Sequence, residues 1–238
     1  MLTSRPAYIV IMFVITTVIT LFIFCFAIRK AEATDDRKKR ARLIYAGILL
    51  WLALQAVLAS NDFYKNIQAT PQKLMAVLLL PLSIIVFLFI TRTGRKFIDK
   101  LPLQPLTWLH IVRIAVEIVL YFLFLHSYIP QLMTFEGRNF DILAGITAPL
   151  IAYFGFVKKR LSGKFILAWN IISLLLVLNI MVNAILSVPT PFQQFAFDQP
   201  NIAVFYFPFI WLPSFIVPVV IFSHLIAIRQ LTNDKRRY

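Results

Sequence analysis

Seven apolar stretches, each close to the length needed to cross a lipid bilayer, dominate this chain. A transmembrane helix needs roughly 20 mainly apolar residues, and helices are expected because hydrocarbon offers no partner to an unpaired backbone group. The connecting segments are short. We therefore expect an all-α, polytopic transmembrane bundle, with residues 1–238 forming a single integral-membrane domain. The seven predicted spans are 7–28, 43–60, 74–91, 107–128, 142–157, 165–187 and 202–228.

The composition agrees with a membrane protein. The chain is 60% hydrophobic and only 14% charged, whereas soluble domains carry roughly 25% charged residues. The first stretch is longer than the roughly 7–15 apolar residues of a signal-peptide core, so we expect it to be retained as a helix. In a soluble protein the net charge of +14 would indicate nucleic-acid binding. Here membrane topology explains it better, and no nucleic-acid partner is expected.

The basic residues are divided unequally between alternate connecting segments. With the N-terminus outside, nineteen of the 24 Lys and Arg residues fall in the cytoplasmic segments and the C-terminal tail. Cytoplasmic segments of membrane proteins are enriched in Lys and Arg, so this division predicts an N-out, C-in orientation. Short loops, the lack of an N-x-[ST] sequon and the lack of a targeting peptide suggest a bacterial inner (cytoplasmic) membrane. The outer side holds Arg5, Lys65, Lys73 and Arg138.

The fourth stretch contains two residues of opposite charge, Arg113 and Glu117. With ~1.5 Å of rise per residue, Glu117 lies near the middle of a ~30 Å hydrocarbon core. Charged groups at that depth are costly and by default indicate a functional site. Alternatively, the two residues form a structural i,i+4 ion pair that fixes the register of the helix. Arg before Glu is the weaker order for such a pair.

Further polar residues follow in the segment after this span and in the sixth span. Glu136, Arg138 and Asp141 fall within six residues, although Asp141 can also serve as the N-cap of the fifth helix. Asn179 and Asn183 are one turn apart in the sixth span, where asparagines also commonly bond neighbouring helices. All these side chains lie from mid-membrane outward, which predicts a polar cavity open to the extracytoplasmic side. The predicted ligand-binding residues are Arg113, Glu117, Tyr121, Glu136, Arg138, Asn139, Asp141, Asn179 and Asn183.

The motifs of several known chemistries are missing. The last stretch has no lysine for a retinal Schiff base, the three histidines form no HExxH pattern, and the single Cys25 cannot form a cysteine cluster. We therefore expect no metal and no cofactor. The one cofactor alternative is haem ligated by His110 and His224, which lie at similar depth on different spans.

The last stretch also carries Pro208, Pro213 and Pro218 at intervals of five residues. Each proline removes one backbone hydrogen bond and disturbs the preceding turn. A kinked helix over 202–228 is therefore expected, and it is a candidate moving part.

These patterns favour a membrane protein that binds or translocates a small polar ligand through an outward-facing intramembrane pocket. Glu117 would be its acidic contact or proton carrier, and Arg113 would neutralise that carboxylate. One alternative is a membrane-embedded enzyme acting on a lipid or isoprenoid, with Glu117 or Glu136 as general acid or base. The other is a non-catalytic signalling or scaffold protein. Apart from the lipid bilayer, no partner is predicted. The sequence contains no GxxxG motif, so it does not indicate an oligomeric state.

Overall fold

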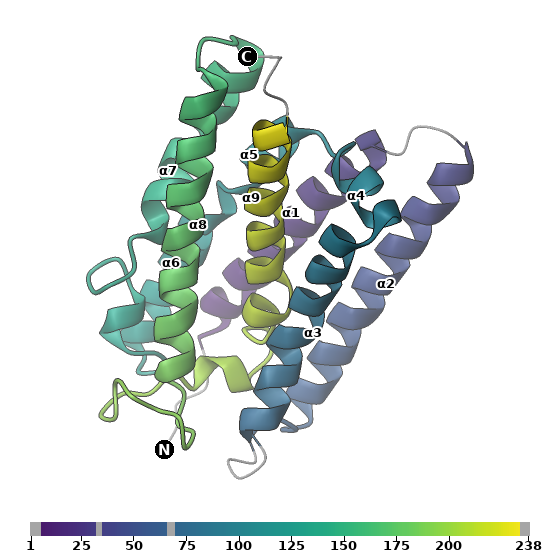
Figure 1. Ribbon diagram of the computed structural model, residues 1–238. Helices are drawn as coiled ribbons and strands as arrows, with labels where there is room; N and C mark the ends of the chain where they lie inside the picture. The colour runs from purple at the N-terminus through teal and green to yellow at the C-terminus, as the bar shows by residue number, and fades with distance from the viewer. Residues whose placement is uncertain (1–5, 32–34, 66–69, 234–238) are drawn as a thin grey trace.

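The computed structural model describes residues 6–31, 35–65 and 70–233, and its regular structure within these ranges is entirely helical (Figure 1). The basic residues Arg5, Lys235, Arg236 and Arg237, which contribute to the predicted orientation, lie outside these ranges. The helices are α1 (Ala7–Ala31), α2 (Asp35–Ser60), α3 (Thr70–Ile90), α4 (Arg92–Ile98), α5 (Leu103–Leu109), α6 (Val112–Leu125), α7 (Asp141–Ile151), α8 (Gly163–Leu186) and α9 (Val217–Asn233).

The described chain confirms the predicted all-helical class, and six of its helical segments are long and apolar enough to cross a membrane. A shorter apolar segment, Asp141–Val157, joins α7 to a π-helical end at Ala152–Val157. The six long segments are Ala7–Ala31, Lys39–Ser60, Lys73–Ile90, Leu103–Leu125, Gly163–Leu186 and Leu212–Asn233.

The segments Leu103–Leu125 and Leu212–Asn233 form the centre of the bundle. They are the most buried of the long segments, whereas α2 and α3 are the least buried. In Figure 1, α2 and α3 lie at one edge of the bundle, and α8 lies beside α9. Because hydrocarbon is as apolar as leucine, the exposed leucines of α2, such as Leu43 and Leu50, suit a surface that faces lipid.

The fourth predicted span is not one continuous α-helix. Between α5 and α6, the N–H groups of His110 and Arg113 donate to the carbonyl oxygens of Thr107 and His110 at 3.2 and 3.1 Å. These are 3₁₀-type bonds to the residue three positions back, and a 3₁₀ turn aligns side chains that are three residues apart. The turn therefore places His110 and Arg113 on the same side of the chain.

The last helix begins about ten residues later than the sequence predicted. Ala203–Phe205 form a short 3₁₀-helix and residues 206–210 form a bend and a turn. The π-helical segment Leu212–Ile216 then leads into α9. Pro208 therefore precedes the helix and cannot kink it. Pro218 lacks the N–H that would donate to the Ser214 carbonyl oxygen, and the indole N–H of Trp51 donates to that oxygen instead, at 3.0 Å.

Trp211 makes the reciprocal link. Its indole N–H donates to the carbonyl oxygen of Leu52 at 2.9 Å. The two tryptophans thus join α2 to the start of the last span through backbone carbonyls. The bond from Trp51 also pairs the carbonyl oxygen that Pro218 leaves free, as neighbouring helices do for proline-interrupted helices inside a membrane.

Helices α6 and α7 approach each other closely at Gly145. A Cβ atom at this position would lie 2.9 Å from Cγ1 of Ile114 and 3.3 Å from Cβ of Arg113. Such distances are too short for an ordinary side-chain contact, so the glycine permits this approach. As a consequence, the start of α7 lies directly beside Arg113.

Candidate functional site

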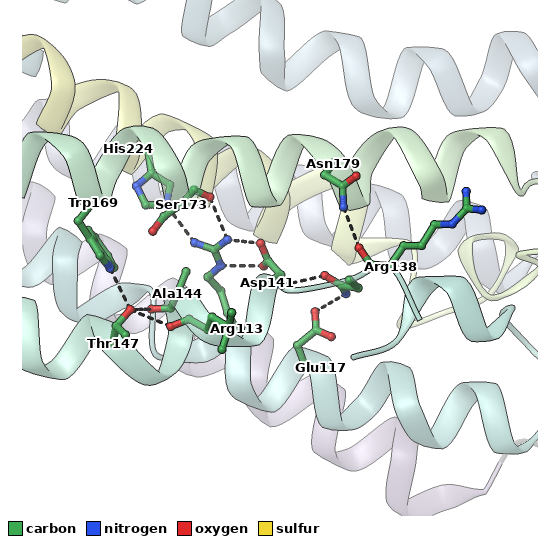
Figure 2. Close-up of polar contacts among 12 residues, drawn as sticks. Arg113, Glu117, Arg138, Asp141, Ala144, Thr147, Trp169, Ser173, Asn179 and His224 are labelled. Atoms are coloured by element: carbon green, nitrogen blue, oxygen red, sulfur yellow. Dashed lines mark hydrogen bonds and ion pairs between the residues drawn. The ribbon is translucent and has the colours of Figure 1, made fainter. Parts of the chain in front are cut away.

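Arg113 is the centre of a buried polar network, and its own side chain is only 2% exposed. The guanidinium binds both carboxylate oxygens of Asp141, with Nε to Oδ2 at 2.7 Å and Nη2 to Oδ1. Nη2 also donates to the carbonyl oxygen of Ser173 at 3.1 Å, and Nη1 lies 3.0 Å from Nε2 of His224. Figure 2 shows these contacts, which connect α6, α7, α8 and α9 around one side chain.

The ion pair that the sequence suggested between Arg113 and Glu117 is therefore not formed; Asp141 is the partner of Arg113. A guanidinium and a carboxylate form two parallel hydrogen bonds only when they approach in one plane. An i,i+4 pair with Arg first is poorly placed for that geometry. By contrast, the close approach of α7 at Gly145 brings Asp141 alongside Arg113 from a different helix.

The contact with Arg113 fixes the tautomer of His224. Arginine has only N–H donors, so Nε2 of His224 must accept. Nδ1 then carries the proton and donates to Oδ1 of Asn170 at 2.9 Å. The amide nitrogen of Asn170 donates in turn to the carbonyl oxygen of Ile166 at 2.9 Å. The chain of bonds from Arg113 therefore ends on the backbone of α8.

The environment of Glu117 differs from that of Asp141. Its side chain is buried, and Oε1 accepts a hydrogen bond from Nδ2 of Asn139 at 2.5 Å. Its second oxygen, Oε2, has no hydrogen-bond partner among the described residues. The guanidinium of Arg113 is paired with Asp141. Glu117 is therefore a buried carboxyl group with one amide contact and no ion pair with a described residue.

Asn139 connects the two acids. Its Nδ2 donates to Glu117 and to the carbonyl oxygen of Met133, the latter at 3.0 Å, while its Oδ1 accepts from the backbone N–H of Asp141 at 3.0 Å. The N-cap position of α7 is Phe140, and Asp141 is the first residue of the helix. The expectation that Asp141 is the N-cap is therefore wrong. Its carboxylate nevertheless lies where the helix dipole favours negative charge.

His110 and His224 form a parallel stack, with ring centroids 3.8 Å apart and an interplanar angle of 10°. Trp169 packs against both rings with centroids at 5.6 Å. Bis-histidine haem ligation places the porphyrin and its iron between the two rings. A stack at van der Waals distance leaves no space for that group, so the geometry does not fit the haem alternative. The part of the chain that the structure describes also holds no cluster of three or more His, Cys, Asp or Glu side chains suited to a metal ion.

The remaining predicted residues lie apart from Arg113. Glu136 and Arg138 are exposed, and the Arg138 guanidinium lies 5.4 Å from the ring centroid of Phe195. Tyr121 stacks on Phe135 with centroids 5.0 Å apart.

On α8, Asn179 donates to the carbonyl oxygen of Arg138 at 2.9 Å, and Asn183 donates to the carbonyl oxygen of Asn179 at 2.9 Å. The bond from Asn179 holds the segment before α7 against α8, whereas the bond from Asn183 lies within α8. The structure thus brings Arg113, Glu117, Asn139 and Asp141 together, and places the other five predicted residues around them or on the surface.

The sequence reasoning did not assign His224, Asn170 and Ser173 to this site. The signal that could have found them was the donor capacity of Arg113. One carboxylate satisfies only part of the five N–H groups of a guanidinium, so a buried arginine needs further acceptors. Asn170 and His224 were polar residues within other spans, but the sequence could not show that they face Arg113.

Two cavities lie in other parts of the bundle. The central cavity, of about 110 Å³, is bounded mainly by α6, α8 and the start of the last span. The lateral cavity, of about 760 Å³, is bounded by α1, α2, α3, α4 and the last span. Both are lined almost entirely by apolar side chains, and none of the nine predicted ligand-binding residues lines either of them. Met133, whose carbonyl oxygen accepts from Asn139, borders the central cavity.

A protein-family model described as a domain of unknown function (DUF8737) matches residues 70–232. This match covers more than half of the chain. The chain belongs to the DUF8737 family. No curated protein and no solved structure matches it. The DUF8737 region runs from α3 to α9 and therefore contains every residue of the Arg113 network.

Removing the charge of Asp141 should strongly destabilise the protein. Asp141→Asn leaves the buried guanidinium without a counter-charge, and breaking a buried pair in this way costs about 3–5 kcal/mol of unfolding free energy. The matched control is Asp99→Asn, because Asp99 pairs with Arg229 at 2.8 Å on the surface, where a pair contributes at most about 1 kcal/mol. Unfolding in mixed detergent micelles measures both. Equal losses for the two variants would contradict the importance of the buried pair.

Proposed function

We propose that the chain crosses an inner membrane seven times, with its N-terminus outside and its C-terminus inside. Figure 1 supports an odd number of crossings, since α1 begins at the lower end of the bundle and α9 ends at the upper end. The seventh crossing would be Asp141–Val157, whose 17 residues (11 in α7 and 6 in the π-helical end) extend ~26 Å at ~1.5 Å per residue. That length approaches the ~30 Å of a hydrocarbon core.

Within this topology, we propose that the protein binds or translocates a small polar ligand through a pocket that faces the extracytoplasmic side. The observation that carries the proposal is the free oxygen of Glu117, a buried acid beside an ion pair that already neutralises Arg113. When an ionisable residue inside a membrane is not neutralised by a structural ion pair, it indicates a ligand or proton site.

The network suggests separate structural and ligand-binding roles for its charged residues. The Arg113–Asp141 pair fixes the relative position of α6 and α7, and Glu117 provides the group that contacts a ligand or carries a proton. Asn139 holds one oxygen of Glu117 and belongs to the segment before α7. Movement of that segment would open Glu117 towards Glu136 and Arg138, which are exposed at the surface.

One observation makes the enzymatic alternative less suitable. A lipid-directed enzyme would need its general acid or base next to an apolar chamber. Neither Glu117 nor Glu136 lines the central or the lateral cavity. A scaffold role remains the outcome if Glu117 proves to act only on stability.

Replacing Glu117 should remove ligand binding and preserve the fold. The purified protein is screened by thermal unfolding against amino acids, sugars, organic acids and inorganic ions, because a ligand that binds only the folded state raises the melting temperature. We expect a solute that stabilises the wild type to leave Glu117→Gln unchanged. Asp62→Asn, which removes an exposed acid paired with Lys65, should respond as the wild type does. A normal response of Glu117→Gln contradicts the proposal, and unfolding of that variant supports a purely structural role.

The proposed topology predicts which residues a membrane-impermeant thiol reagent reaches in intact cells. With Cys25 replaced by serine, Glu136→Cys and Phe197→Cys should be labelled from outside. Lys158→Cys, between Asp141–Val157 and α8, should be labelled only after permeabilisation. All three positions are exposed in the structure. If Glu136→Cys and Lys158→Cys are labelled from the same side, Asp141–Val157 does not cross the membrane.

A further inference from the structure

We propose that the lateral cavity is a binding site for one acyl chain of an anionic phospholipid, whose headgroup is bound by Arg40. The cavity has a volume of about 760 Å³, which lies within the roughly 300–1,000 Å³ range of small-molecule sites. It is separate from the Arg113 network and requires only that the protein lies in a membrane.

The position of the cavity along α2 matches the depth of one leaflet. On α2, its lining extends from Arg40 to Trp51, eleven residues apart, which corresponds to ~16 Å of helix. Half of a ~30 Å hydrocarbon core is ~15 Å. A chain that enters beside Arg40 therefore reaches Trp51 near the bilayer midplane, where the Trp51–Ser214 hydrogen bond joins α2 to the last span.

Charge complementarity identifies the headgroup. Arg40 is an exposed arginine that lines the cavity, and it lies near the start of α2. The neighbouring helix α4, which also lines this end through Gly94 and Phe97, carries Arg92, Arg95 and Lys96. Basic residues at a membrane surface attract anionic lipids, and a guanidinium suits the phosphate oxygens.

The other lining residues indicate that the occupant of the cavity is a hydrocarbon chain. They include side chains such as Ile48, Leu80, Ile84 and Phe222. The exception at the deep end is the hydroxyl of Ser214, a buried residue whose Oγ has no hydrogen-bond partner among the described residues. A ligand with its polar group at the deep end would need this hydroxyl, whereas an acyl chain would not, so Ser214 distinguishes the two types of occupant.

Gly47 offers a way to fill the cavity without disturbing the helices. It lines the cavity, and a Cβ atom at this position would meet no heavy atom within 4 Å. Gly47→Phe therefore places a ring in the space assigned to the acyl chain. Its neighbour Ala46 is exposed and does not line the cavity, so Ala46→Phe adds the same ring on the lipid-facing side and is the matched control.

The test is native mass spectrometry of the full chain, extracted from bilayers of phosphatidylglycerol and phosphatidylcholine in equal amounts. We expect the wild type and Ala46→Phe to retain phosphatidylglycerol in preference to phosphatidylcholine, and Gly47→Phe to lose the retained lipid. Arg40→Gln should reduce the preference by about fivefold, which is the effect of about one basic residue at a membrane surface. Arg42→Gln, which removes a charge outside the cavity, should not change it.

Three results would overturn the proposal. Equal retention of both lipids by the wild type would show adventitious lipid only. Equal retention by Gly47→Phe and Ala46→Phe would place the lipid outside the cavity. Loss of binding in Ser214→Ala but not in Arg40→Gln would assign the cavity to a ligand whose polar group lies at the deep end. The arginine variants decide the headgroup assignment even if Gly47→Phe does not fold.

Discussion

The structure depends on the neutralisation of one buried guanidinium. Arg113 lies within a span, where water cannot solvate it, so every N–H group that stays unpaired costs free energy. Its partners come from three other helices: Asp141 at the start of α7, Ser173 on α8 and His224 on α9. Satisfying Arg113 therefore requires these helices to pack in one relative arrangement. Breaking such a set is far more costly than replacing it by apolar side chains would be, which is consistent with a role in specifying the arrangement.

The same requirement separates the two acids. Asp141 rather than Glu117 is the carboxylate that binds the guanidinium of Arg113, in bidentate geometry. Further N–H groups of Arg113 contact the Ser173 carbonyl oxygen and Nε2 of His224. Glu117 then depends on the amide of Asn139. Proximity in the sequence suggested one pair, whereas the approach of α7 at Gly145 produced another. Glu117, the acid outside the pair, is the residue to which we assign the ligand or proton contact in the proposed function.

The helical class and most span positions could be predicted because hydrocarbon forces long apolar segments into helices. The break at His110 and the late start of the last helix could not. The first follows from a local 3₁₀ turn and the second from hydrogen bonds with other segments, such as those from Ile202 and Ala203 to the Tyr128 carbonyl oxygen at 3.0 and 3.1 Å. Of the site, the sequence identified its charged residues from their cost in a membrane. Their pairing depends on contacts between helices, which spacing within one helix cannot predict.

The assignment of Asp141 as the partner of Arg113 is the central claim, and a pair of double-mutant cycles tests it most directly. Each cycle compares single and double neutral variants by their free energies of unfolding, so that it isolates the coupling between two side chains. We predict a coupling of at least about 2 kcal/mol between Arg113 and Asp141, and less than about 1 kcal/mol between Arg113 and Glu117. A larger coupling of Arg113 to Glu117 than to Asp141 would contradict this assignment.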